Sequence, residues 1–147
     1  MKTIKEILLT AVLFAIALGA SAQDKVISFE QLPAKARQFV SDYYSADRVS
    51  IVTEDREFLE GKSYEVTLKD GVELEFDASG NWKEVDAERQ PVPASIIPAS
   101  ISAYIQKSFP DNEVVQISRS SREYEVELTN GIDLEFNSKG EFLRIDD

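Results

Sequence analysis

The chain has 147 residues, a formal net charge of −11, and neither cysteine nor histidine. The missing residue types exclude disulfide bonds, thiol nucleophiles and the usual zinc sites, and they remove the commonest general base of enzymes. The acidic balance argues against nucleic acid and anionic membrane surfaces as partners, and it favours plain solvation or a cationic partner.

The segment 1–22 has the pattern of a secretory signal peptide. Two lysines precede an apolar run from Ile7 to Leu18, and small residues lead to a cleavage site between Ala22 and Gln23. The run is about a dozen residues, shorter than the roughly 20 that span a bilayer. We expect a periplasmic or secreted protein of the bacterial type, with no membrane anchor after cleavage. Cleavage leaves the chain from Gln23 to Asp147, and the loss of two lysines and one glutamate makes the net charge −12.

An internal repeat organises the rest of the chain. The segment Tyr64–Phe76 returns 60 positions later as Tyr124–Phe136, and the match continues without a gap to Asp86 and Asp146. A single unit of about 60 residues would be marginally stable alone. We therefore expect two units, 23–87 and 88–147, that share one fold.

Each unit begins with apolar residues at helical spacing after a proline. The pattern predicts helices over about 33–45 and 98–109. The offset between the two helices is larger by five positions than the offset between the later strands, so the first unit contains an insertion. We place it in Glu54–Lys62, as a longer loop between the first two strands of that unit.

Four strands are expected in each unit, beginning near 48–53 and 113–118. Apolar and polar residues then alternate, which is typical of an antiparallel sheet covered on one face. Three-residue loops ending at Gly71 and Gly131 place apolar side chains opposite one another, and they require these glycines in the left-handed region. The prediction is an α+β fold with two tandem α-β-β-β-β repeats and both helices on one face of the sheet.

The same alternation predicts a polar outer face. Glu65 is expected opposite Glu75 and Glu125 opposite Glu135, with like charges adjacent and Arg144 near Glu135. By uninterrupted alternation, Trp82 and Phe142 point the same way as the acids. The candidate partner-binding residues are Trp82, Phe142, Glu65, Glu73, Glu75, Glu125, Glu127 and Glu135.

Each feature of this face has two interpretations. Trp82 and Phe142 are either anchors of a protein interface or residues that complete the core at the end of the sheet. The acids are either a binding surface or a solvated sheet face. Calcium at Glu65 and Glu75 is disfavoured because a strand face offers few ligands and no EF-hand spacing occurs. A catalytic carboxylate pair would need a cleft, and the chain has no phosphate-binding glycine loop, so we expect no enzyme, no metal and no cofactor.

The repeated motifs resemble those of the β-lactamase-inhibitor-like, PepSY-like family of exported bacterial proteins, frequent in Bacteroidetes. The resemblance rests on Leu32-Pro33 and Ile97-Pro98, the Gly71 and Gly131 turns, and Leu-Glu-Phe before Gly80 and Gly140. It implies helices packed against an antiparallel sheet, as in the β-lactamase inhibitor proteins, whose open sheet face meets an enzyme. Those inhibitors carry disulfides, and this chain has none.

The leading hypothesis is a non-enzymatic periplasmic protein-binding or inhibitor-like module that uses the outer face, with an unidentified protein as partner, such as an exported hydrolase. The alternative is a cation- or envelope-associated structural protein with no specific protein target. A carrier of a small ligand between sheet and helices is a third reading, and it would require a large internal cavity.

Overall fold

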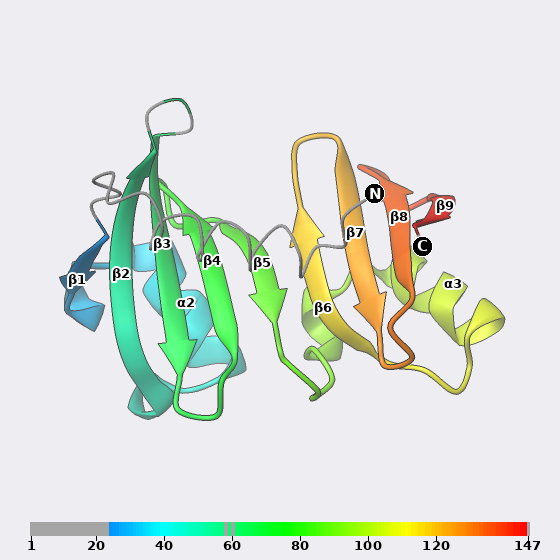
Figure 1. The fold of residues 1–147 in the computed structure, drawn as a ribbon, viewed down its shortest axis with the longest axis horizontal. Coiled ribbons are helices and arrows are strands. Elements are labelled where there is room, and N and C mark those ends of the chain that lie inside the picture. Colours follow the sequence, from blue (N-terminus) through cyan, green and yellow to red (C-terminus); the bar gives the residue numbers. More distant parts are fainter. Residues whose placement is uncertain (1–23, 58, 60, 147) are drawn as a thin grey trace, which may run out of the picture.

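A computed structural model describes residues 24–57, 59 and 61–146, so the predicted signal peptide and its cleavage point lie outside the described residues. These residues form one open antiparallel sheet of nine strands, in which sequence neighbours are also neighbours in space (Figure 1). The strands are β1 (Lys25–Ile27), β2 (Val49–Glu57), β3 (Gly61–Leu68), β4 (Glu73–Asp77), β5 (Trp82–Asp86), β6 (Val114–Arg119), β7 (Glu123–Leu128), β8 (Asp133–Asn137) and β9 (Phe142–Asp146). The α+β class and the continuous sheet are confirmed.

Two α-helices, α2 (Ala34–Tyr43) and α3 (Ala99–Ser108), lie on the same side of the sheet, behind it in Figure 1. Each follows a proline at its N-cap and buries two residues four positions apart. The other helical elements of the described residues are the 3₁₀ turns η1 (Phe29–Gln31), η2 (Ala46–Arg48) and η3 (Ala94–Ile96). We call the side with α2 and α3 the helix face and the opposite side the outer face. The first half is β1–β5 with α2, and the second half is β6–β9 with α3.

The hairpin turns follow the prediction. The amide of Leu68 donates to the carbonyl of Val72, and that of Leu128 donates to Ile132, which closes two three-residue loops. Gly71 has a φ of +93°, in the region that favours glycine. The strand registers that these loops set are the same in the two halves at positions 60 residues apart.

The predicted long loop within Glu54–Lys62 is wrong. Strand β2 continues to Glu57 and β3 begins at Gly61, with Arg56 opposite Lys62. The inserted residues therefore lengthen a two-stranded ladder, because each added pair supplies further backbone hydrogen bonds. Strand β1 was also not predicted, and it pairs with β2 through Ile27 opposite Val52.

One hydrophobic cluster runs through both halves. Its largest fully buried side chains include Phe76 and Phe136, which occupy equivalent positions in β4 and β8. The segment between the halves is part of this core, since Ala87 and Val92 are buried and their amides donate to Val115 and Val114 in β6. The two halves therefore share a core and a sheet.

Candidate binding surface

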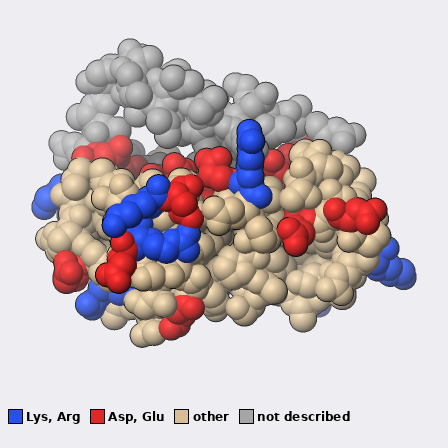
Figure 2. Space-filling view, turned by 90° about the horizontal axis from the view of Figure 1, so that it is seen from below, with Lys and Arg blue, Asp and Glu red and all other residues tan. Residues whose placement is uncertain are grey.

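Five carboxylates on β3, β4 and β5 lie on neighbouring positions of the outer face. Glu65, Glu75 and Glu84 lie opposite one another across the three strands, and Glu73 lies opposite Asp86 on the next row. We call this set (Glu65, Glu73, Glu75, Glu84 and Asp86) the acidic patch. Its residues, with Leu74 beneath them, line one shallow depression. Figure 2 shows Asp and Glu side chains along one long side of the molecule.

The surroundings of the acidic patch disfavour the charged form of two of its carboxyl groups. Desolvation, followed by the charges of Glu73 and Glu75, raises the pKa of Glu65 to about 7. Desolvation and neighbouring carboxylates also raise the pKa of Glu84 to about 7, although a hydrogen bond from Gln116 of β6 opposes the shift. Like charges placed directly across strands destabilise a sheet, so the patch lowers stability unless something neutralises it. The ammonium of Lys83 meets Glu75 at 3.1 Å.

The second half carries a related row with a different charge balance. Glu125 lies opposite Glu135, and Glu127 opposite Asp133, as the register predicted. The guanidinium of Arg144 lies 2.7 Å from Glu135, which confirms the expected ion pair. Glu127, Asp133 and Glu135 are buried, whereas Glu65 and Glu73 are exposed. The first half is therefore the more accessible acidic surface.

The predicted position of Trp82 and Phe142 is wrong: both lie on the helix face. In each half a β-bulge inserts one extra residue, Lys83 or Leu143, between the aromatic residue and the next pair. The extra residue reverses the alternation, so Trp82 stands opposite Phe76 and Phe142 opposite Phe136. Both aromatics are partly buried against the core, as the second interpretation of the sequence held.

The aromatic contacts show what holds these two residues. The ring of Phe142 stacks on Tyr104 of α3, with centroids 4.5 Å apart. The ring centroids of Trp82 and Phe39 of α2 are 6.3 Å apart, and the guanidinium carbon of Arg119 lies over the Trp82 ring, 4.1 Å from its centroid. The Nε of Arg119 also donates to the backbone carbonyl of Trp82 at 2.7 Å. Both aromatics therefore pack on the helix face and are not part of the outer-face row of acids.

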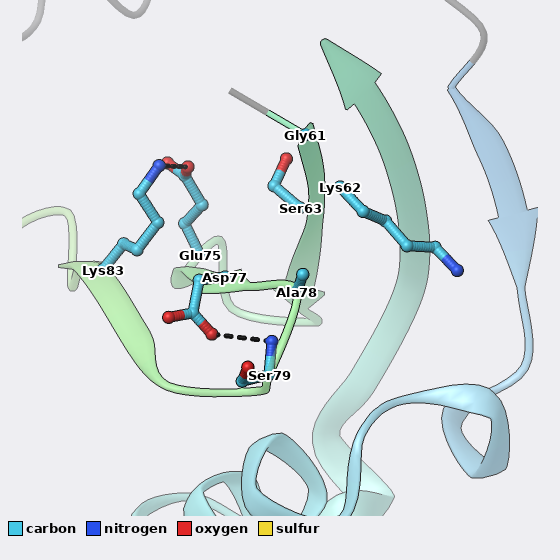
Figure 3. A pocket seen from close by; sticks show the side chains of 8 residues that line it. All are labelled: Gly61, Lys62, Ser63, Glu75, Asp77, Ala78, Ser79 and Lys83. Carbon is cyan, nitrogen blue, oxygen red and sulfur yellow. Dashed lines mark hydrogen bonds and ion pairs between the residues drawn. The ribbon is translucent and has the colours of Figure 1, made fainter. Parts of the chain in front are cut away.

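A polar pocket of about 270 Å³ lies beside the acidic patch, at the turn between β4 and β5 (Figure 3). Asp77 in its wall accepts backbone hydrogen bonds from Ser79 and Asn81, each 2.9 Å long. Partial burial opposes a low pKa for Asp77, but the hydrogen bonds from Asn81 and Ser79 hold it below its usual value. Its carboxylate therefore closes the turn and is not available as a ligand.

Within the described residues, no group of three or more acidic, His or Cys side chains is placed to hold one metal ion. Sequence reasoning found Glu65, Glu73 and Glu75 but left Glu84 and Asp86 out of the candidate set. The alternation that placed Glu73 and Glu75 on the outer face also places these two there, so the signal was present. The contact from Gln116 to Glu84 could not be seen in the sequence, because it joins strands of the two halves that are far apart in the chain.

Comparison with known proteins gives the family. The family model described as "Putative beta-lactamase-inhibitor-like, PepSY-like" matches residues 62–144, more than half of the chain. The chain belongs to this family. No curated protein matches the sequence.

Solved structures of similar chains come from Bacteroides. A periplasmic protein of the DUF2874 family from Bacteroides vulgatus is 31% identical with a TM-score of 0.81, over 87% of this chain and 100% of that one. A protein from Bacteroides thetaiotaomicron, described as a "putative calcium-regulated periplasmic protein", is 40% identical with a TM-score of 0.81, over 84% and 97% of the two chains. A third, a periplasmic protein of unknown function from Bacteroides vulgatus, is 34% identical with a TM-score of 0.81, over 84% and 99%.

The PepSY-like relatives agree with an exported protein, since all three are described as periplasmic. Among the residues that the structure describes, no helix has the length and apolar character needed to cross a membrane.

Proposed function

We propose that this PepSY-like protein is a non-enzymatic periplasmic module that binds a basic partner protein through the acidic patch. The observation that carries the proposal is the row of Glu65, Glu75 and Glu84, whose carboxylates oppose one another on a face that no described helix covers. A partner that presents Lys or Arg would relieve the mutual repulsion and would be steered toward the patch.

The raised pKa values of Glu65 and Glu84 support the same function. A cationic partner favours the charged form of each carboxyl group, so binding releases protons when the pH is below about 7. Affinity for a basic partner should therefore increase as the pH rises from 6 to 8. Because the family is described as β-lactamase-inhibitor-like, an exported hydrolase is the first partner class to test.

We further infer that residues 23–87 and 88–147 are two copies of one unit arranged as in the β-lactamase inhibitor proteins, preceded by a cleaved signal peptide over 1–22. The equal registers in the two halves support the repeat. The acidic patch belongs to the first copy and its junction with the second.

The test compares two variants with the same charge change. The triple variant Glu65→Gln, Glu73→Gln, Glu84→Gln removes three charges from the patch. The control Glu30→Gln, Asp42→Asn, Asp111→Asn removes three charges from exposed positions elsewhere. Each protein is immobilised and exposed to an envelope extract of the source organism, and bound proteins are quantified at rising salt.

We expect a basic protein that the parent and the control retain and the patch variant loses, with retention weakening as salt rises. For that protein, the patch variant should bind at least tenfold more weakly. Equal retention by all three proteins would contradict the proposal.

Calcium binding on the same carboxylates is the second candidate. It is favoured by the 40% identical relative described as calcium-regulated. The present side-chain positions do not form a group that holds a metal, so binding would need the patch to rearrange. Calorimetry with calcium chloride decides: a saturable one-to-one site lost in the patch variant supports this candidate, and only weak, unsaturable heats reject it.

A further inference from the structure

Strand β9 is the last strand of the sheet, and within the described residues no strand pairs with its second edge. Its counterpart in the first half is β5, which has the same register and the same bulge against the preceding strand. The second edge of β5, however, is covered by β6. The molecule therefore contains a covered and an open version of one edge, as Figure 1 shows at β5 and β9.

The covered version shows what this edge accepts. Strand β6 runs antiparallel to β5 with Ile117 opposite Val85, and both side chains are completely buried. Side chains of β6 also contact side chains of β5. The amide of Gln116 donates a hydrogen bond to Glu84, and the guanidinium of Arg119 lies over the ring of Trp82. The second edge of β5 is thus covered by an apolar residue (Ile117), a polar residue (Gln116) and a cation (Arg119) of β6.

Strand β9 exposes two large apolar side chains, although it lies at the edge of the described sheet. Leu143 is 52% exposed and Ile145 is 45% exposed, while Val85, the counterpart of Ile145, is fully buried. The covered strand has the charged Lys83 where the open strand has Leu143. Proteins usually place lysine or other charges on an open edge to prevent pairing. Here the lysine is on the covered strand β5 and the leucine is on β9. Leu143 therefore does not prevent another strand from pairing with the edge of β9.

We propose that the open edge of β9 binds an extended segment of a partner protein, which adds to the sheet as a tenth, antiparallel strand in the way that β6 adds to β5. Backbone hydrogen bonds supply affinity in this mode, and alternate side chains supply specificity. The segment has an apolar residue opposite Ile145 and a cation that covers Phe142.

Arg144 defines the remaining specificity of the proposed segment. It replaces Glu84, and its side chain remains 58% exposed although it is paired with Glu135. A guanidinium has five N–H donors, so it can donate to a second carboxylate while it stays paired with Glu135. The partner segment therefore carries an acid where β6 carries Gln116.

The test uses a peptide made from this chain. The probe has the sequence of residues 113–120 with Gln116→Glu, labelled for fluorescence anisotropy and titrated with the purified protein. We expect saturable binding that is at least tenfold weaker with Leu143→Lys. Val26→Lys is the matched control, because Val26 is 64% exposed on β1 at the opposite edge, and it should leave binding unchanged.

Two N-methylated versions of the peptide test the mode of binding. Methylation at residues 116 and 118, or at residues 115, 117 and 119, removes amide donors from one edge of an extended peptide or from the other. One pattern should abolish binding, while the other should keep it. Equal binding of both patterns, or no saturable binding of the parent peptide, would overturn the proposal.

Two further measurements separate this edge from other surfaces. The variant with Glu65→Gln, Glu73→Gln and Glu84→Gln should bind the peptide as the parent does, so failure of the acidic patch and failure of this edge are distinguishable. Sedimentation of the parent should show a monomer. A dimer that Leu143→Lys dissociates would mean that a second copy occupies the edge, which would also overturn the proposal.

Discussion

The ends of the two halves have the same sequence pattern and the same bulge, yet their surroundings differ. Trp82 in β5 contacts Phe39 of α2 and the guanidinium of Arg119, and β6 pairs with its strand. Phe142 in β9 stacks on Tyr104 and has no described strand beyond it. The comparison shows that local sequence sets the conformation of these strands, while burial and charge depend on what packs next to them.

The largest expected effect is at the two aromatic positions. Trp82→Ala should lower the free energy of unfolding by about 3 kcal/mol, because it removes the contact with Phe39 and leaves Arg119 without its ring. Phe142→Ala should cost about 2 kcal/mol, since no described strand pairs with the second edge of its strand. Urea unfolding of both variants measures the difference. A smaller loss of unfolding free energy for Trp82→Ala than for Phe142→Ala would show that the contacts of β5 with β6 do not make Trp82 the more strongly held residue.

The next effect concerns the turns that approach the helices. Gly80 has a φ of +86°, and a Cβ there would lie 2.8 Å from the Pro33 side chain and 3.0 Å from the Ala36 backbone nitrogen. Gly80→Ala should therefore cost about 2 kcal/mol, from left-handed strain and a contact with backbone that cannot move away.

Gly140→Ala is the matched change in the second half. A Cβ there would overlap the hydroxyl of Ser100, which can rotate away, and would lie 3.2 Å from the Ser100 Cβ, with no backbone atom among its nearest contacts, so we expect a loss of about 1 kcal/mol. Thermal melts of the two variants test the order. Equal melting temperatures would mean that the loop of the first half moves as easily as the side chain of Ser100.

The smallest effect is a pH dependence in the first half. Desolvation and nearby carboxylates raise the pKa of Glu84 from 4.5 to about 7. Between these two values the folded protein keeps a proton that the unfolded chain has released, so this group makes stability fall as the pH rises. The counterpart position holds Arg144, which has no such proton to lose in this range.

The variant Glu84→Gln isolates this contribution. At pH 8 it should raise the free energy of unfolding by on the order of 1 kcal/mol, and at pH 5 it should leave it unchanged. Glu30→Gln, which removes one exposed charge from η1, is the control. A gain for Glu84→Gln that is the same at both pH values would contradict a raised pKa.

Local patterns in the sequence determined most of the fold. Apolar residues at helical spacing gave α2 and α3, and the glycines at positions 71 and 131 set hairpin registers that place Glu65 opposite Glu75. These features could be predicted because each depends on residues within one turn or one hairpin, where spacing and backbone geometry decide the outcome. The outer-face position of the acids followed from the same registers.

Only the tertiary structure decided how Trp82 and Phe142 point, because a bulge adds a residue that the alternation of a sequence does not reveal. It also decided that β6 covers β5 while β9 stays open, and that Gln116 and Arg119 reach across this junction. These contacts join residues that are far apart in the chain, and their energies depend on burial and packing that no local pattern contains. Local sequence thus determined the two helices and the registers of the β3–β4 and β7–β8 hairpins, and long-range packing determined which of their surfaces are available to a partner.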